Sequence, residues 1–198
     1  MANSIKQYGM FIDLDRCTGC NACVVVCKQE HDLPPRSDAV PGSKGLAYVQ
    51  LLDLGPEGDY PHLSFYHVPV LCMHCSDPPC IEACPTDAIY KREDGLVLIN
   101  EEACTGCGAC PPVCPYDALN MDRDQGTAKK CTLCVHLIDQ DQQPACAQAC
   151  NSGAMIFGNL CDPYSRISKA VKAAGDMGFP LKPQRGTGPN IYYVRSYK

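Results

Sequence analysis

The sequence contains no tryptophan, only four phenylalanines, and no hydrophobic run that approaches the ~20 residues needed to cross a bilayer. So few aromatic side chains leave little material for an ordinary core, while proline (17) and glycine (16) are abundant. The opening stretch MANSIKQYG lacks the charged and apolar regions of a signal peptide. We therefore expect a chain that does not insert into the membrane and does not export itself.

Common enzyme motifs are also missing. The sequence has no P-loop, no G-x-G-x-x-G fingerprint, no nucleophile elbow and no radical-enzyme cysteine spacing. Something other than aromatic and aliphatic packing must organise the 198 residues. Cysteine is the candidate, because the chain contains 17 of them.

These cysteines do not fit a disulfide framework, because triplets spaced two residues apart cannot all reach separate partners and an odd number leaves one unpaired. Sixteen of them form four quartets with related spacing. The quartets are Cys17, Cys20, Cys23 and Cys27; Cys72, Cys75, Cys80 and Cys84; Cys104, Cys107, Cys110 and Cys114; and Cys131, Cys134, Cys146 and Cys150.

The spacing C-x2-C-x2-C-x3-C, in which proline can follow the last cysteine, is typical of [4Fe-4S] clusters. Three thiolates wrap one cubane, and the fourth cysteine ligates the other cluster of a pair. Four quartets therefore predict four [4Fe-4S] clusters in two pairs, but spacing alone leaves open which quartets pair. With four clusters the net charge falls from −5 to roughly −13, which argues against a nucleic-acid partner.

The repeat extends beyond the cysteines. CPTDAI, CPYDAL and CNSGAM are variants of one phrase, and MFIDLDRCTGC resembles VLINEEACTGC. Residues 88–99, AIYKREDGLVLI, predict two short strands that turn at Asp94 and Gly95. These features indicate a duplicated two-cluster ferredoxin unit.

Two other uses of the cysteines compete with this interpretation. The fourth quartet has a spacing near that of a zinc ribbon, although its context favours iron. A C-x2-C pair could be a thioredoxin-like dithiol, but that motif does not normally occur four times in one chain. His74, within CMHC, could bind metal, but we favour a hydrogen-bonding or packing role because four cysteines already complete the site.

The remaining polar residues have modest interpretations. We expect ordinary surface or strand positions for His31, His62, His67 and His136, and a small apolar role for Cys161. Positive charge near the sulfurs could raise cluster potentials, with a solvated face as the equal alternative. The residues in question are Lys91, Arg92, Lys129 and Lys130.

Two segments are not explained by cluster binding. Between the first two quartets, residues 47–54 and 62–68 predict a strand pair beside the ferredoxin core. Residues 162–176 predict a helix, followed by an extended tail at 181–198. If exposed, Ile191, Tyr192, Tyr193 and Tyr197 would form a docking surface, and packing of the tail on the chain itself is the equal alternative.

Taken together, residues 7–28, 72–119, 131–150 and 186–194 resemble the four-cluster iron-sulfur subunits that partner molybdopterin oxidoreductases of the dimethyl sulfoxide reductase family. Members of this group include subunits of polysulfide, thiosulfate, arsenate and dimethyl sulfoxide reductases and of formate dehydrogenases. Cys107 is intact, so the resemblance implies a cubane at every site. Asn151 replaces the usual proline, a departure confined to the local turn.

The resemblance also implies a nested pairing, first quartet with fourth and second with third. The implied ligand sets are Cys17, Cys20, Cys23 and Cys150; Cys27, Cys131, Cys134 and Cys146; Cys72, Cys75, Cys80 and Cys114; and Cys84, Cys104, Cys107 and Cys110. The expected fold is α+β. It comprises two bacterial-type ferredoxin-like domains (1–30 with 118–160, and 68–117), a β-rich insertion (31–67), and a helix with a docking tail (161–198).

The resemblance implies an electron-transfer subunit that is not an enzyme on its own. It would relay single electrons between a large molybdopterin subunit carrying Mo or W and a quinone-reactive membrane-anchor subunit or a soluble carrier. Co-export with a signal-bearing partner would place it on the periplasmic face, with a cytoplasmic assembly as the alternative. Two other hypotheses are a free polyferredoxin, which has no need of the insertion and tail, and a zinc-stapled scaffold.

Overall fold

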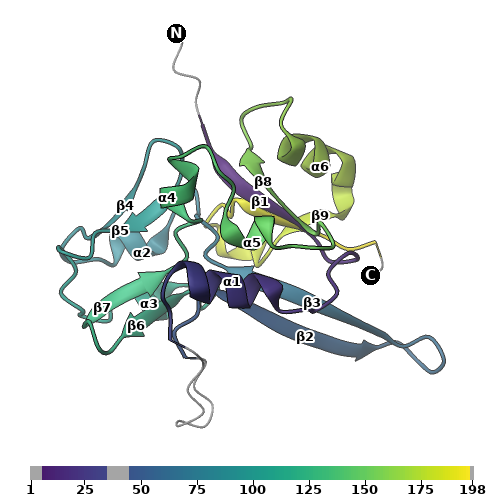
Figure 1. Cartoon of the computed structure of the whole chain (residues 1–198), viewed down its shortest axis with the longest axis horizontal. Coiled ribbons are helices and arrows are strands. Elements are labelled where there is room, and N and C mark those ends of the chain that lie inside the picture. The colour runs from purple at the N-terminus through teal and green to yellow at the C-terminus, as the bar shows by residue number, and fades with distance from the viewer. Residues whose placement is uncertain (1–5, 35–44, 197–198) are drawn as a thin grey trace.

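Short strands and one-turn helices follow one another along the chain, and most cysteines lie at or between their ends. The computed structural model describes residues 6–34 and 45–196 (Figure 1). Residues 1–5, residues 35–44 of the expected insertion, and Tyr197 lie outside the described residues. Helices and strands are both present, as predicted for an α+β protein.

A four-stranded sheet joins the two ends of the described chain. In spatial order its strands are β8 (Met155–Asn159), β1 (Tyr8–Asp13), β10 (Ile191–Val194) and β9 (Gly178–Pro180). β1 is antiparallel to β8 and parallel to β10. Alternate residues of β1 face opposite sides, so Met10 and Ile12 join the main core while Phe11 packs beneath a helix.

That helix is α6 (Arg166–Ala174), which confirms the helix predicted here. The Ser165 hydroxyl caps it by accepting the Ser168 N–H at 3.1 Å. Ile167 is fully buried and packs the helix against Phe11 and Val194 of the sheet. Two 3-10 turns, η1 (Gly175–Met177) and η2 (Pro183–Arg185), connect α6 to the last strands.

The described part of the tail is a sheet strand and not an exposed docking segment. Ile191 and Tyr193 are fully buried in β10, and the Tyr193 hydroxyl donates to the Pro69 carbonyl at 2.8 Å. The expectation of an exposed aromatic tail is therefore wrong for these residues. The alternative, packing on the chain itself, is correct, because parallel pairing with β1 satisfies the backbone of β10.

The predicted strand pair between the first two quartets is present as an antiparallel hairpin of β2 (Val49–Glu57) and β3 (Ser64–Leu71). It projects from the rest of the chain in Figure 1. Its base is buried through Val49, Val68 and Leu71, whereas Phe65 near the tip is 67% exposed. The hairpin base is thus part of the main core, and β3 runs directly into the second quartet. The division into domains at residues 30, 67, 117 and 160 stays a prediction.

Two smaller hairpins lie on the opposite side of the molecule (Figure 1). β4 (Ile89–Lys91) pairs with β5 (Val97–Ile99), as predicted, and β6 (Leu119–Asp122) pairs with β7 (Thr127–Lys130). The β4–β5 turn needs Gly95, whose φ is 84° and whose added Cβ would lie 2.1 Å from the Gln7 side chain. The one-turn helices α2 (Pro79–Glu82) and α3 (Cys110–Val113) accompany these hairpins.

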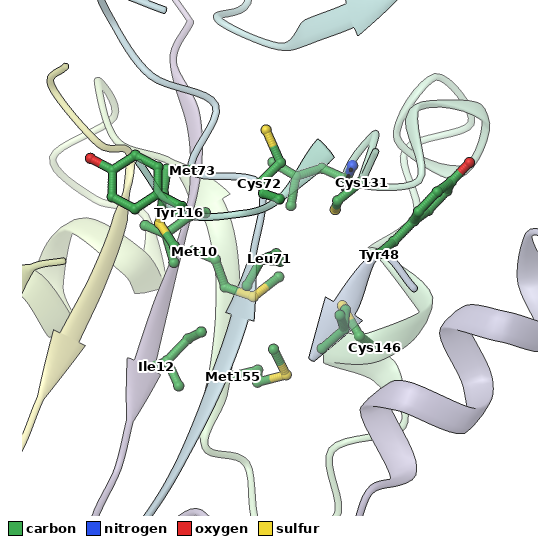
Figure 2. Packing of buried hydrophobic residues seen from close by; sticks show 14 of the residues in the cluster. Met10, Ile12, Tyr48, Leu71, Cys72, Met73, Tyr116, Cys131, Cys146 and Met155 are labelled. Atoms are coloured by element: carbon green, nitrogen blue, oxygen red, sulfur yellow. Dashed lines mark hydrogen bonds between the residues drawn. The ribbon is translucent and has the colours of Figure 1, made fainter. Parts of the chain in front are cut away.

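Cysteines form part of the main core. α1 (Ala22–Glu30), α4 (Val135–Ile138) and α5 (Ala145–Gln148) surround it together with the sheet and the β2–β3 base. Figure 2 shows Cys72, Cys131 and Cys146 among buried residues such as Met10 and Leu71. The prediction that cysteines replace part of an ordinary core is confirmed.

Candidate metal centres

Three sets of four cysteines each line a separate cavity. The first site consists of Cys17, Cys20, Cys23 and Cys150. The third site consists of Cys72, Cys75, Cys80 and Cys114. The fourth site consists of Cys84, Cys104, Cys107 and Cys110.

The last cysteine of a quartet faces a different cavity from the other three. In the third quartet, Cys104, Cys107 and Cys110 line the fourth site while Cys114 lines the third site. α3 begins at Cys110 and ends before Cys114, so the two side chains leave the helix at opposite ends. The second quartet makes the reciprocal exchange through Cys84.

A tight loop brings the cysteines of the fourth site together. Gly106 and Gly108 lie between them with φ of 67° and 72°, a region open to glycine. A Cβ at Gly106 would lie 2.0 Å from the carbonyl oxygen of Gly126 in the β6–β7 turn. The glycine in C-T-G-C thus permits the loop to rest on that hairpin.

We call the four remaining cysteines the second site, and none is more than 4% exposed: Cys27, Cys131, Cys134 and Cys146. Burial raises the pKa of Cys27 to about 12, with the neighbouring Cys134 as a further cause. Burial, and then the proximity of Cys27 and Cys146, raises the pKa of Cys131 well above its ordinary value. The three chain segments therefore bring these thiols close enough to interact.

The donor chemistry of all four sites fits [4Fe-4S] clusters, for which four cysteine thiolates are the usual ligands. Burial also raises the pKa of Cys75 and Cys110 to about 11. Grouped, buried thiolates repel one another unless a cationic centre replaces their protons. Backbone N–H groups also stabilise negative charge on the sulfurs. Leu133 donates to Cys131 Sγ at 3.3 Å, and Ala128 donates to Cys104 Sγ at 3.4 Å.

The fourth quartet is not arranged as a zinc ribbon. Cys150 lines the first site, and proximity to Cys150 raises the pKa of Cys17 in addition to the effect of burial. Cys146 interacts instead with Cys134 and Cys27 of the second site. Within residues 6–34 and 45–196, no three His, Cys, Asp or Glu side chains are placed to share a single metal ion. Cys150 of this quartet therefore faces a different site from Cys146.

His74 has the structural role favoured from the sequence. It is fully buried, and its Nδ1 accepts the Val97 N–H at 3.0 Å. Burial, and then the charge of Lys130, holds the pKa of His74 well below its ordinary value. The ring is therefore neutral and carries its proton on Nε2, which has no hydrogen-bond partner among the described residues.

The basic residues near the cysteines differ in environment. Lys129 is 9% exposed and pairs with Glu101 at 2.5 Å, and Lys130 is 2% exposed. The solvated-face alternative is therefore wrong for both lysines, which are buried. Lys91 donates to the Ser76 carbonyl at 3.0 Å, and Arg92 pairs with Asp94 and Asp139, near the surface.

Two functional contacts were not predicted from the sequence. His31 is half-buried, and its Nε2 lies 3.4 Å from Cys134 Sγ of the second site, so its expected role as an ordinary surface residue is wrong. Its position four residues after Cys27 was the available signal. Thr187 is buried, is 2.6 Å from the Tyr116 hydroxyl, and lowers the pKa of Cys75 against the larger effect of burial. Thr187 lies in the stretch 186–194 that contributes to the family resemblance, but that stretch assigned it no contact with a cysteine.

The other singled-out residues are peripheral. His67 contacts Asp53 at 2.6 Å and His136 contacts Glu30 at 2.7 Å, as expected for surface or strand positions. Cys161 is exposed in a turn, so its expected apolar packing is wrong. No helix in the described ranges has the length and hydropathy required to span a bilayer.

Two family models, both described as 4Fe-4S dicluster domains, match the chain at residues 16–88 and 63–160. These ranges contain all sixteen cysteines of the four sites. The protein is therefore an iron-sulfur protein of the 4Fe-4S dicluster class.

Its relatives are subunits of larger oxidoreductases. The chain is 38% identical to a subunit of the tetrathionate reductase of Salmonella typhimurium, over 95% of this chain and 72% of that protein. It is 38% identical to a subunit of the sulfite dehydrogenase of Allochromatium vinosum (96% and 83%), and 32% identical to the arsenate respiratory reductase iron-sulfur subunit of a Shewanella species (96% and 97%). The chain belongs to this family of iron-sulfur subunits, which confirms the resemblance stated from its motifs.

Proposed function

We propose that the protein is an electron-transfer subunit that binds four [4Fe-4S] clusters, one in each of the four sites. The observation that carries this proposal is the exchange of the last cysteine between quartets, repeated on both sides of the molecule. Each bound cluster would supply a one-electron redox centre. The ligand sets are those implied by the family resemblance, and the surroundings of the cysteines support them.

We infer that shared elements join the four sites into one row. α1 contributes Cys23 to the first site and Cys27 to the second. Cys131 of the second site and Cys72 of the third lie in the same buried cluster (Figure 2). α3 and the residue that follows it link the third site to the fourth. The expected sequence is therefore first, second, third, fourth.

Exposure distinguishes the ends of this row from its middle. Cys20 of the first site and Cys107 of the fourth site are exposed, whereas the second site is buried. A row with accessible ends suits exchange of electrons with two different partners. A large molybdopterin subunit with Mo or W and a quinone-reactive membrane subunit, or a soluble carrier, are the partners that we propose, with no catalytic reaction assigned to this chain alone.

The assembly proposed here lies on the periplasmic face of the membrane, reached by co-export with a signal-bearing partner, and a cytoplasmic assembly is the alternative. A free-standing polyferredoxin is the second candidate function. The relatives favour the first candidate, because three of them are named as subunits of reductases or a dehydrogenase.

Elemental analysis of the protein, isolated gently from its native host on an affinity tag, tests the proposal. We expect about 16 irons per chain together with about one Mo or W. The same iron without Mo or W would favour the polyferredoxin, and zinc without iron would contradict both. A Cys161→Ala variant, altered outside the four sites, is the control and should retain all the iron.

A further inference from the structure

Lys130 is a buried cation at the end of β7, with only 2% of its surface exposed. Its ammonium group donates to two backbone carbonyls, that of Val97 in β5 and that of Cys131, the latter at 3.2 Å. These bonds hold the charge in place. A lysine is rarely buried to this extent unless an anion compensates it.

The two carbonyls locate the ammonium between two cluster sites. Val97 lines the cavity of the third site, as does Leu119, the partner of Lys130 in the β6–β7 register. Cys131 belongs to the second site. Lys130 therefore lies between the second and third sites.

No carboxylate of residues 6–34 or 45–196 forms an ion pair with this charge. Lys130 is absent from the ion pairs between described residues, whereas the adjacent Lys129 pairs with Glu101 at 2.5 Å. An unpaired buried charge is costly, so a counter-charge is needed. A cubane held by four thiolates is negative and gains one more negative charge on reduction.

We propose that Lys130 sets the reduction potential of the third-site cluster, by stabilising its reduced form with a fixed, buried positive charge. The assignment rests on the proposed function, and it extends that function by naming the residue that tunes a centre in the middle of the row. The third site is favoured over the second because Val97, whose carbonyl accepts from Lys130, and Leu119, opposite Lys130 in the sheet, both line the third-site cavity.

The test is an EPR-monitored redox titration of the isolated complex with Lys130→Met, Lys130→Gln and Lys130→Arg variants. Iron content and the cluster signals of the wild type are measured first, and a Cys75→Ser variant identifies the third-site signal. If the wild type lacks four clusters, the proposed function fails. If it has them and the potentials do not respond to Lys130, only the present inference fails.

We expect the reduction equilibrium of the third-site cluster to fall at least tenfold in both neutral variants, about 59 mV for one electron, and to be restored in Lys130→Arg. The matched control, Lys129→Met, removes a neighbouring ammonium that is paired with Glu101 and should leave this potential unchanged. Loss of the third-site cluster alone from both neutral variants, with retention in Lys130→Arg, would also support a counter-charge.

Three results would overturn the proposal. The first is an unchanged third-site potential in both neutral variants with full iron content. The second is a normal potential in Lys130→Gln with a lowered one in Lys130→Met, since hydrogen bonding and not charge would then be responsible. The third is loss of all clusters from every variant, Lys130→Arg included, which would indicate a structural role.

Discussion

The division of the third quartet between two cavities gives a prediction that iron counting can decide. Cys114 lines the third site with Cys75, whereas Cys107 lines the fourth site. Removing one of four thiolates exposes a cubane to loss, so each single Cys→Ala variant should lose about four of about 16 irons. The informative quantity is how the losses combine.

Two double variants separate the possibilities. Cys114→Ala with Cys75→Ala should lose about four irons, as each single variant does, because both residues serve one cavity. Cys114→Ala with Cys107→Ala should lose about eight, because two cavities are affected. Iron and sulfide analysis of the purified complex, with EPR of the remaining clusters, is the assay. A loss of eight in the first pair and four in the second would refute the exchange of cysteines.

Three further changes test packing and hydrogen bonding. Tyr193→Phe leaves the Pro69 carbonyl without its 2.8 Å donor and should lower the free energy of unfolding by about 1–3 kcal/mol in denaturant titrations; an unchanged midpoint would contradict the burial argument. Gly106→Ala places a Cβ 2.0 Å from the Gly126 carbonyl oxygen, whereas a Cβ at Gly108 meets no atom within 4 Å. Gly106→Ala should therefore reduce the iron content more than Gly108→Ala. Equal iron contents would contradict the close approach of this loop to Gly126. His31→Leu removes a ring nitrogen 3.4 Å from Cys134 Sγ, which would donate to this sulfur once it is a cluster-bound thiolate. The variant should disfavour reduction of the second-site cluster by about 1 kcal/mol in a redox titration, while glutamine at this position keeps a donor. The same potential in both variants would rule out a hydrogen-bonding role.

The grouping of the cysteines into triplets was predictable because their spacing is local, whereas the ligand sets that join distant quartets were implied by the family resemblance and stay a prediction. Three thiolates spaced by two residues can ligate one cubane wherever the loop lies in the chain. The turn at Gly95 was equally local, since four or five consecutive residues specify a hairpin turn that needs a glycine with positive φ. In both cases a short window of sequence contained the interactions that matter.

Partners distant in the chain explain the failures. Ile191 and Tyr193 look like an exposed tail in sequence, but parallel pairing with β1 buries them, and no local pattern specifies a parallel partner so far away. In sequence Lys130 resembles a surface lysine, because its hydrogen-bond acceptor, the Val97 carbonyl, lies in a different hairpin. His31 meets Cys134 only because α1 packs beside the fourth quartet.

The arrangement of the sites along the chain has a consequence for the order in which the protein can fold. The third-site cysteines come from residues 72–114, a segment whose synthesis is finished before residue 150 is added. The first site, in contrast, joins Cys17 to Cys150. Closing a longer loop costs more entropy, and contacts between distant residues form late. During synthesis the inner sites therefore close before the outer ones, and β10 enters the sheet beside β1 only when residues 191–194 have emerged. Iron-sulfur assembly on this chain should proceed from the centre of the sequence outward.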